Sequence, residues 1–177
     1  MVCIIIDANL AFCIFTSVPE DDFRPVFDWL HAPDKNGCVV YGGKLAHELS
    51  SRKASRRYLL ALSRAGRARL IPEDIVQSEE EDLRRSRLCQ SNDPHVIALA
   101  RVSGARTLCS HDQKLHQDFR NPKLLSNLRG RVYQNATHTP VLHHDSCCSR
   151  GGKIEDGGDR NRRPLFSLWL SLQLPCC

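Results

Sequence analysis

Short apolar runs alternate with amphipathic segments over most of the chain. Val2–Ile6 is apolar and rich in β-branched residues, and Asp7 ends it, which predicts a strand buried on both faces. Between residues 22 and 31, apolar side chains recur at the three- and four-residue spacing of a helix. The same two patterns predict further strands at residues 38–41, 68–71, 107–110 and 131–133, and further helices at residues 44–50, 54–65, 73–89, 93–104 and 111–119.

The segment Ser91-Asn92-Asp93-Pro94 predicts the start of one helix, because a capping side chain is followed by proline in the first turn. Strands that alternate with helices are typical of an α/β fold with a mostly parallel sheet. The pattern fades after about Gln134. We therefore expect one domain at residues 1–135 and a flexible tail, containing His, Cys and Gly, at residues 136–177.

Size and composition are those of a globular protein with one core. The 177 residues are 41% hydrophobic and 25% charged. No apolar stretch reaches the roughly 20 residues that span a bilayer, and no basic and apolar leader begins the chain. Several of the nine cysteines lie in apolar strands, where free thiols pack as small hydrophobes. We therefore expect a reduced, cytoplasmic protein without a membrane partner.

The net charge of +5 is too small to indicate a nucleic-acid partner by itself, but its distribution is uneven. Between residues 52 and 69 there are seven basic residues and no acidic one. Such a segment can exchange counterions with phosphates, and it can equally be a solvated helix surface. The candidate contacts to an RNA backbone are Arg52, Lys53, Arg56, Arg57 and Lys114.

Four acidic residues occupy positions from which their side chains can converge. Asp7 and Asp112 follow predicted strands, and in a parallel sheet ligands bind beyond the carboxyl ends of the strands. Asp93 begins a predicted helix, and Glu48 is the only acidic residue in a basic and apolar region. Each acid alone has a simpler explanation as a cap, a turn residue or a solvent-facing helix residue.

Grouped carboxylates repel one another, which raises their pKa values unless a cation neutralises them. Ligation by oxygen alone favours Mg²⁺ or Mn²⁺ over zinc. Such ions activate water and stabilise the charge that develops on a phosphodiester. The four acids together therefore indicate metal-dependent phosphodiester hydrolysis.

The order of these motifs resembles the PIN-domain ribonuclease family. The resemblance covers about residues 1–135 and rests on four segments: Ile4-Ile5-Ile6-Asp7-Ala8-Asn9, the segment around Glu48, Ser91-Asn92-Asp93 before Ile97-Ala98-Leu99-Ala100, and Leu108-Cys109-Ser110-His111-Asp112. It implies a three-layer α/β/α sandwich and a Mg²⁺- or Mn²⁺-dependent endoribonuclease that hydrolyses RNA with a metal-activated water. Many such domains are toxins of toxin–antitoxin pairs, so it also implies an antitoxin protein and a homodimer as partners.

The resemblance assigns roles residue by residue. The catalytic and metal-binding acids would be Asp7, Glu48, Asp93 and Asp112. Asn9 and Ser110 match polar positions that orient a carboxylate or a water, and Asp118 is a further candidate acid.

Two other functions remain open. A catalytically silent PIN-fold module that binds RNA or protein would need the basic segment but not four intact acids. A zinc- or thiol-based regulator would use the tail, although the spacing there matches no standard zinc site; the candidate ligands are His138, His143, His144, Cys147 and Cys148. The alternating apolar residues 165–174 could add to a sheet edge or remain an uncommitted tail.

Overall fold

A computed structural model of the chain describes residues 2–32, 34–35, 37–125 and 129–143. Five parallel strands form one sheet in the order β3-β2-β1-β4-β5. The strands are β1 (Val2–Ile6), β2 (Gly37–Gly42), β3 (Ala68–Ile71), β4 (Thr107–Cys109) and β5 (Arg131–Tyr133). The helices are α1 (Ala11–Ile14), α2 (Arg24–His31), α3 (Gly43–Ser51), α4 (Lys53–Arg64), α5 (Glu73–Ser86), α6 (Pro94–Ser103), α7 (Gln113–Arg120) and the 3₁₀ helix η1 (Ala136–Leu142).

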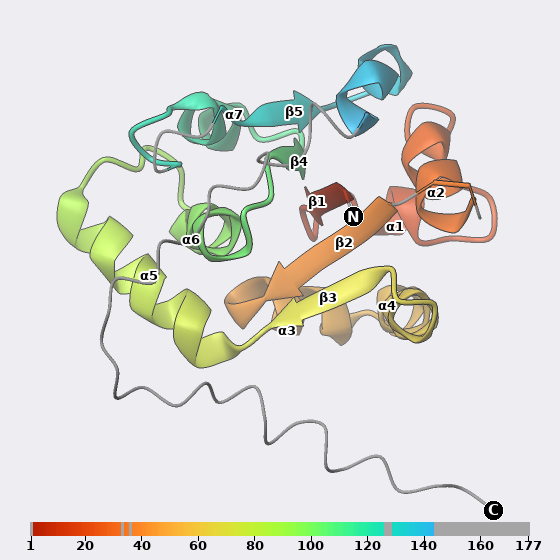
Figure 1. Ribbon diagram of the computed structural model, residues 1–177, viewed down its shortest axis with the longest axis horizontal. Coiled ribbons are helices and arrows are strands. Elements are labelled where there is room, and N and C mark those ends of the chain that lie inside the picture. The colour runs from red at the N-terminus through yellow and green to blue at the C-terminus, as the bar shows by residue number, and fades with distance from the viewer. Residues whose placement is uncertain (1, 33, 36, 126–128, 144–177) are drawn as a thin grey trace, which may run out of the picture.

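The predicted α/β/α sandwich with a parallel sheet is confirmed. Figure 1 shows the strands in the middle of the molecule, with α5 and α6 on one side of them and α1, α2 and α4 on the other. Helices α3, α5 and α6 pack against one another, and α1 contacts α2 and α4. No helix in the described part of the chain has the length and apolar character needed to cross a membrane.

The central strand β1 explains why its sequence is apolar without alternation. Ile4, Ile5 and Ile6 are all fully buried, because helices cover both faces of the sheet. Burying an isoleucine side chain stabilises a fold by about 1.5–3 kcal/mol, so this strand is a main part of the core.

The strand order creates a switch point between β1 and β4. From β1 the chain adds β2 and then β3 in one direction, whereas β4 and β5 extend the sheet in the other direction. Ile6 pairs with Cys109, and the amide of Asp7 donates to the Cys109 carbonyl at 2.9 Å. Asp7 and Ser110 therefore leave the sheet side by side, at the place where a doubly wound sheet binds its ligands.

The junction between β2 and α3 has no loop, since β2 ends at Gly42 and α3 begins at Gly43. Gly43 has φ +51°, a left-handed conformation that glycine tolerates best. A Cβ atom there would lie 2.9 Å from the Val76 side chain of α5. This glycine therefore allows α3, which carries Glu48, to start directly at the sheet and close to α5.

Three differences from the predictions exceed a shift of one or two residues at the end of an element. Helix α1 was not predicted, because four residues are too few to show a helical period. Helix α5 ends at Ser86 rather than at residue 89, since Arg87 adopts the left-handed conformation (φ +53°) that terminates helices.

The third difference is η1, which lies in the segment predicted to be a flexible tail. Leu142 is buried, the Ala136 amide donates to Asp22 Oδ1, and the Tyr133 hydroxyl donates to the Asp22 carbonyl. The packed fold therefore continues to the end of η1. Of the expected His/Cys cluster, His138 and His143 are described, and the rest lies outside the described residues, as do residues 165–174.

Candidate functional site

A polar pocket of about 320 Å³ lies beyond the carboxyl end of β1. Three of the four predicted acids, Asp7, Glu48 and Asp93, line it. They come from three separate parts of the fold: the turn after β1, the middle of α3 and the residue before α6. Tertiary structure thus brings together side chains that are distant in the sequence.

Asp7 is the acid held most firmly. Its Oδ1 accepts a hydrogen bond from the Asn9 amide at 3.0 Å, and its Oδ2 accepts one from Ser110 Oγ at 2.7 Å. Ser110 is fully buried and its Oγ also accepts from the Asp112 amide at 3.0 Å. Both residues predicted to support the site therefore contact Asp7, although Asn9 does so through its backbone.

Glu48 and Asp93 are held more loosely. Glu48 Oε1 lies 3.5 Å from Lys44 Nζ, one helical turn earlier, and about a third of its side chain is exposed. Asp93 stands at the N-cap of α6 with a similar exposure, and Pro94 follows at the first helical position. The predicted helix start is confirmed. Within the described structure the Asp93 side chain makes no capping hydrogen bond to α6, and Asp93 lines the pocket.

Asp112 has a different environment from the other three acids. It does not line the pocket, and its Oδ1 accepts the Leu115 amide at 2.9 Å as the N-cap of α7. Its connection to the site is indirect, because its amide holds the Ser110 hydroxyl that binds Asp7. Both Asp112 and Asp93 precede helices, so their positions in the sequence did not show that Asp112 caps its helix while Asp93 lines the pocket.

Asp118 lies apart from the pocket and is almost completely buried. Its two carboxylate oxygens accept the amides of Gln90 and Ser91 at 2.8–3.0 Å. It therefore anchors the loop that leads to Asp93, and this role accounts for a buried charge without any ligand.

His95 lines the same pocket and was not among the predicted site residues. It is 2% exposed, and its Nε2 lies 3.7 Å from Glu48 Oε2 while its Nδ1 lies 3.9 Å from Asp93 Oδ1. Nδ1 has no hydrogen-bond partner among the described residues. Burial lowers the pKa of His95, and the neighbouring Glu48 carboxylate offsets part of that shift. Its place directly after Asp93-Pro94 was the only sequence signal.

The donor chemistry of the pocket fits a hard divalent cation. Carboxylate oxygens are the preferred protein ligands of Mg²⁺ and Mn²⁺, and three acids and His95 line one pocket. In the present conformation, no three His, Cys, Asp or Glu side chains of the described residues stand close enough to hold an ion. The side chains of Glu48 and Asp93 are each about a third exposed, so neither carboxylate is enclosed by the core.

Basic residues border the pocket on the side of α4. Arg52 lines the pocket itself, and Lys53, Arg56 and Arg57 are exposed at the start of α4. The helix dipole disfavours positive charge at that end, so local stability does not explain their position. Arg67, from the same basic segment, instead donates to the Leu30 carbonyl at 3.0 Å and has a structural contact.

The described cysteines form no disulfide with one another, and several of them lie in environments that suppress thiol reactivity. Burial raises the pKa of Cys13 to about 12, and burial likewise raises the pKa of Cys109. A thiol rather than a thiolate is a poor nucleophile and a poor metal ligand. Within the described part of the chain, these side chains give no support to a thiol-based regulator.

The chain matches no protein-family model, no curated protein and no solved structure. A function for this protein has therefore to be inferred from its fold and from the residues of the pocket.

Proposed function

We propose that this protein is a Mg²⁺- or Mn²⁺-dependent endoribonuclease of the PIN type, with its active site in the pocket at the sheet switch point. The observation that carries the proposal is the convergence of Asp7, Glu48 and Asp93 on one pocket. Three carboxylates in one pocket repel one another, and a divalent cation relieves that repulsion. A pocket of this composition is therefore better suited to holding a cation than to holding an apolar ligand.

The environment of each pocket residue suggests its role in binding the cation. Asp7, fixed by two hydrogen bonds, would be the anchoring ligand, and Glu48 and Asp93 would supply the other carboxylates that hold the ion. When bound, the cation lowers the pKa of a water and stabilises negative charge on the scissile phosphate. Ser110 keeps the Asp7 carboxylate oriented, and Asp112 belongs to the same hydrogen-bonded group through Ser110.

The start of α4 would bind the RNA backbone. Arg52 lines the acidic pocket and is the N-cap residue of α4. Lys53, Arg56 and Arg57, in the first turns of α4, extend the positive surface away from the pocket. Such contacts hold the phosphates without selecting a sequence. A toxin role, an antitoxin partner and a homodimer stay parts of the proposal that follow from the family resemblance. A cytoplasmic location is a further part, and it follows from the composition and the cysteines of the sequence.

The direct test is cleavage of mixed RNAs by the full chain with Mn²⁺ and with EDTA. We expect cleavage with Mn²⁺ that EDTA abolishes, and we expect Asp7→Asn to reduce the rate by at least about 100-fold, because the anchoring carboxylate charge is lost. Asp82→Asn is the matched control, since Asp82 is exposed on α5, outside the pocket, and pairs with Arg85. Equal cleavage by Asp7→Asn and the wild type would rule out this site.

A catalytically silent module that binds RNA or protein is the second candidate. It is favoured by one observation: the described acids are not close enough for ion binding in this conformation. The same assay separates the two functions, because a silent module would bind RNA in a salt-dependent way and leave it intact with Mn²⁺.

A further inference from the structure

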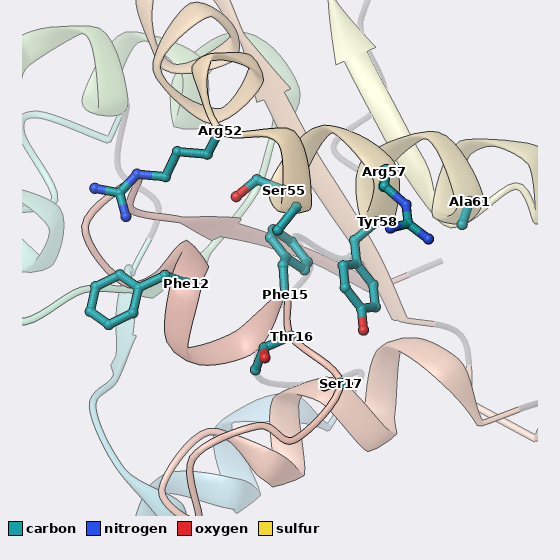
Figure 2. Close-up of a pocket in the computed structure, with 10 residues that line it drawn as sticks. Phe12, Phe15, Thr16, Ser17, Arg52, Ser55, Arg57, Tyr58 and Ala61 are labelled. Atoms are coloured by element: carbon teal, nitrogen blue, oxygen red, sulfur yellow. The ribbon is translucent and has the colours of Figure 1, made fainter.

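A second and larger pocket, of about 640 Å³, lies beside the acidic one. It is formed by α1 and the residues after it on one side, and by Arg52 and the part of α4 up to Ala61 on the other. Figure 2 shows Phe12 and Arg52 at one end of the pocket, Arg57, Tyr58 and Ala61 at the other end, and Phe15 between them.

Phe12 is unusual in this pocket because its ring faces solvent. It is 53% exposed, whereas Phe15 is fully buried and stacks on Tyr58 with 5.9 Å between the ring centroids. The Arg52 guanidinium lies 5.6 Å from the centroid of the Phe12 ring. An exposed aromatic ring beside a guanidinium group is a surface on which another flat π system can stack.

The two pockets adjoin at Arg52, which lines both of them. The larger pocket contains Arg52 and Arg57 and no acidic residue among the described ones. A ligand that extends from the acidic pocket into this one would therefore meet carboxylates first, then a guanidinium group, and then an aromatic ring. A strand of nucleic acid carries phosphates and flat bases along its length, so a phosphate can lie against the guanidinium group while a base lies against the aromatic ring.

We propose that the larger pocket is a nucleobase-binding subsite, in which a base of single-stranded RNA stacks on Phe12 while Arg52 binds the adjacent phosphate. The proposal rests on the proposed function, since it assumes that the scissile phosphate lies in the acidic pocket. Phosphate contacts come from the arginines and are independent of the base, whereas the stacking contact needs a base. A base in a double helix is not free to stack, so the subsite selects single-stranded substrate.

The test measures binding, so that it does not depend on cleavage. Full-length protein carrying Asp7→Asn is titrated, in EDTA, into two fluorescent probes of equal length: a 2′-O-methyl oligouridine and an oligomer of abasic nucleotides. Both probes carry the same phosphates, and only the first carries bases. Base stacking on an aromatic residue contributes about 1–3 kcal/mol, so the oligouridine is expected to bind about 5- to 150-fold more tightly.

Adding Phe12→Ala should bring the two affinities to within about twofold of each other, and Phe12→Trp should preserve the preference for bases. Leu60→Ala is the matched control, because Leu60 is 52% exposed on α4 but does not line the pocket. A preference for oligouridine that survives Phe12→Ala overturns the proposal. So does equal binding of both probes, or of neither, by the chain with Phe12 intact.

The outcomes separate this subsite from the nuclease activity. Mn²⁺-dependent cleavage without any preference for bases overturns the subsite and leaves the proposed function standing. A Phe12-dependent preference for bases, in a protein that cleaves no RNA, supports the base site and overturns the nuclease.

Discussion

At the scale of single residues, the site depends on which hydrogen bonds each aspartate makes. Asp93 and Asp112 both precede helices, but only Asp112 caps its helix with a side-chain hydrogen bond. From the sequence alone, Asp93 and Asp112 could each either cap a helix or line the pocket. Which of the two a residue does depends on its backbone dihedrals and its side-chain rotamer. Asp7 is distinguished by two hydrogen bonds, one of which comes from a residue 103 positions away.

Ser110→Ala tests whether the orientation of Asp7 matters. The change removes the donor to Asp7 Oδ2 and the acceptor for the Asp112 amide. We expect Mn²⁺-dependent cleavage to fall by about 10- to 100-fold, as is typical when a residue that orients a metal ligand is removed. We also expect the free energy of unfolding to fall by about 1 kcal/mol.

Ser103→Ala is the control for the loss of a serine hydroxyl. Ser103 Oγ donates to the Leu99 carbonyl within α6, so its removal should change stability alone. Full activity of Ser110→Ala would mean that Asp7 needs no support from that hydroxyl.

At the scale of elements, short connections decide where the site residues point. The direct junction from β2 into α3 sets the direction of the helix that carries Glu48. The loop before α6 is held by Asp118, which binds the Gln90 and Ser91 amides and so places Asp93. In both cases, a residue outside the pocket determines the position of one inside it.

Gly43→Ala tests the junction between β2 and α3. Gly43 and Gly66 both have positive φ values, but a Cβ at Gly43 would lie 2.9 Å from Val76, whereas a Cβ at Gly66 meets no atom within 4 Å. We expect Gly66→Ala to lower the free energy of unfolding by about 1 kcal/mol, the cost of the left-handed conformation alone. Gly43→Ala should cost about 2–3 kcal/mol, because steric crowding is added.

Urea denaturation of the two variants gives this comparison directly. Equal losses at the two glycines would show that α3 and α5 have room to move apart.

At the scale of the whole molecule, the fold combines a buried central strand, a sheet switch point and two adjoining pockets that share Arg52. The helix η1 completes the structure around α2 and β5. The packed part of the described chain therefore extends beyond residue 135, where the hydrophobic pattern of the sequence ends.

Two truncations test this boundary. A chain that ends after His143 keeps η1, and one that ends after Asn135 loses it together with the buried Leu142. We expect the shorter chain to have a free energy of unfolding lower by about 3 kcal/mol, similar to the loss of a buried leucine side chain. Mn²⁺-dependent cleavage should persist in the chain that ends after His143, since the site residues all precede that point. Equal stability of the two truncations would place the boundary at residue 135.

The sequence by itself determined the elements and their order except for the short helices α1 and η1, because helical and strand periods are local properties of neighbouring residues. Val2–Ile6 as a buried strand and Pro94 at the start of α6 were both predicted, and so was the α/β class. Only the tertiary structure decided which acids meet in one pocket, that His95 lies between two of them, and that Phe12 and Arg52 lie together. These contacts depend on the strand order, on the junction at Gly43 and on side-chain rotamers, all of which are set by packing between distant segments.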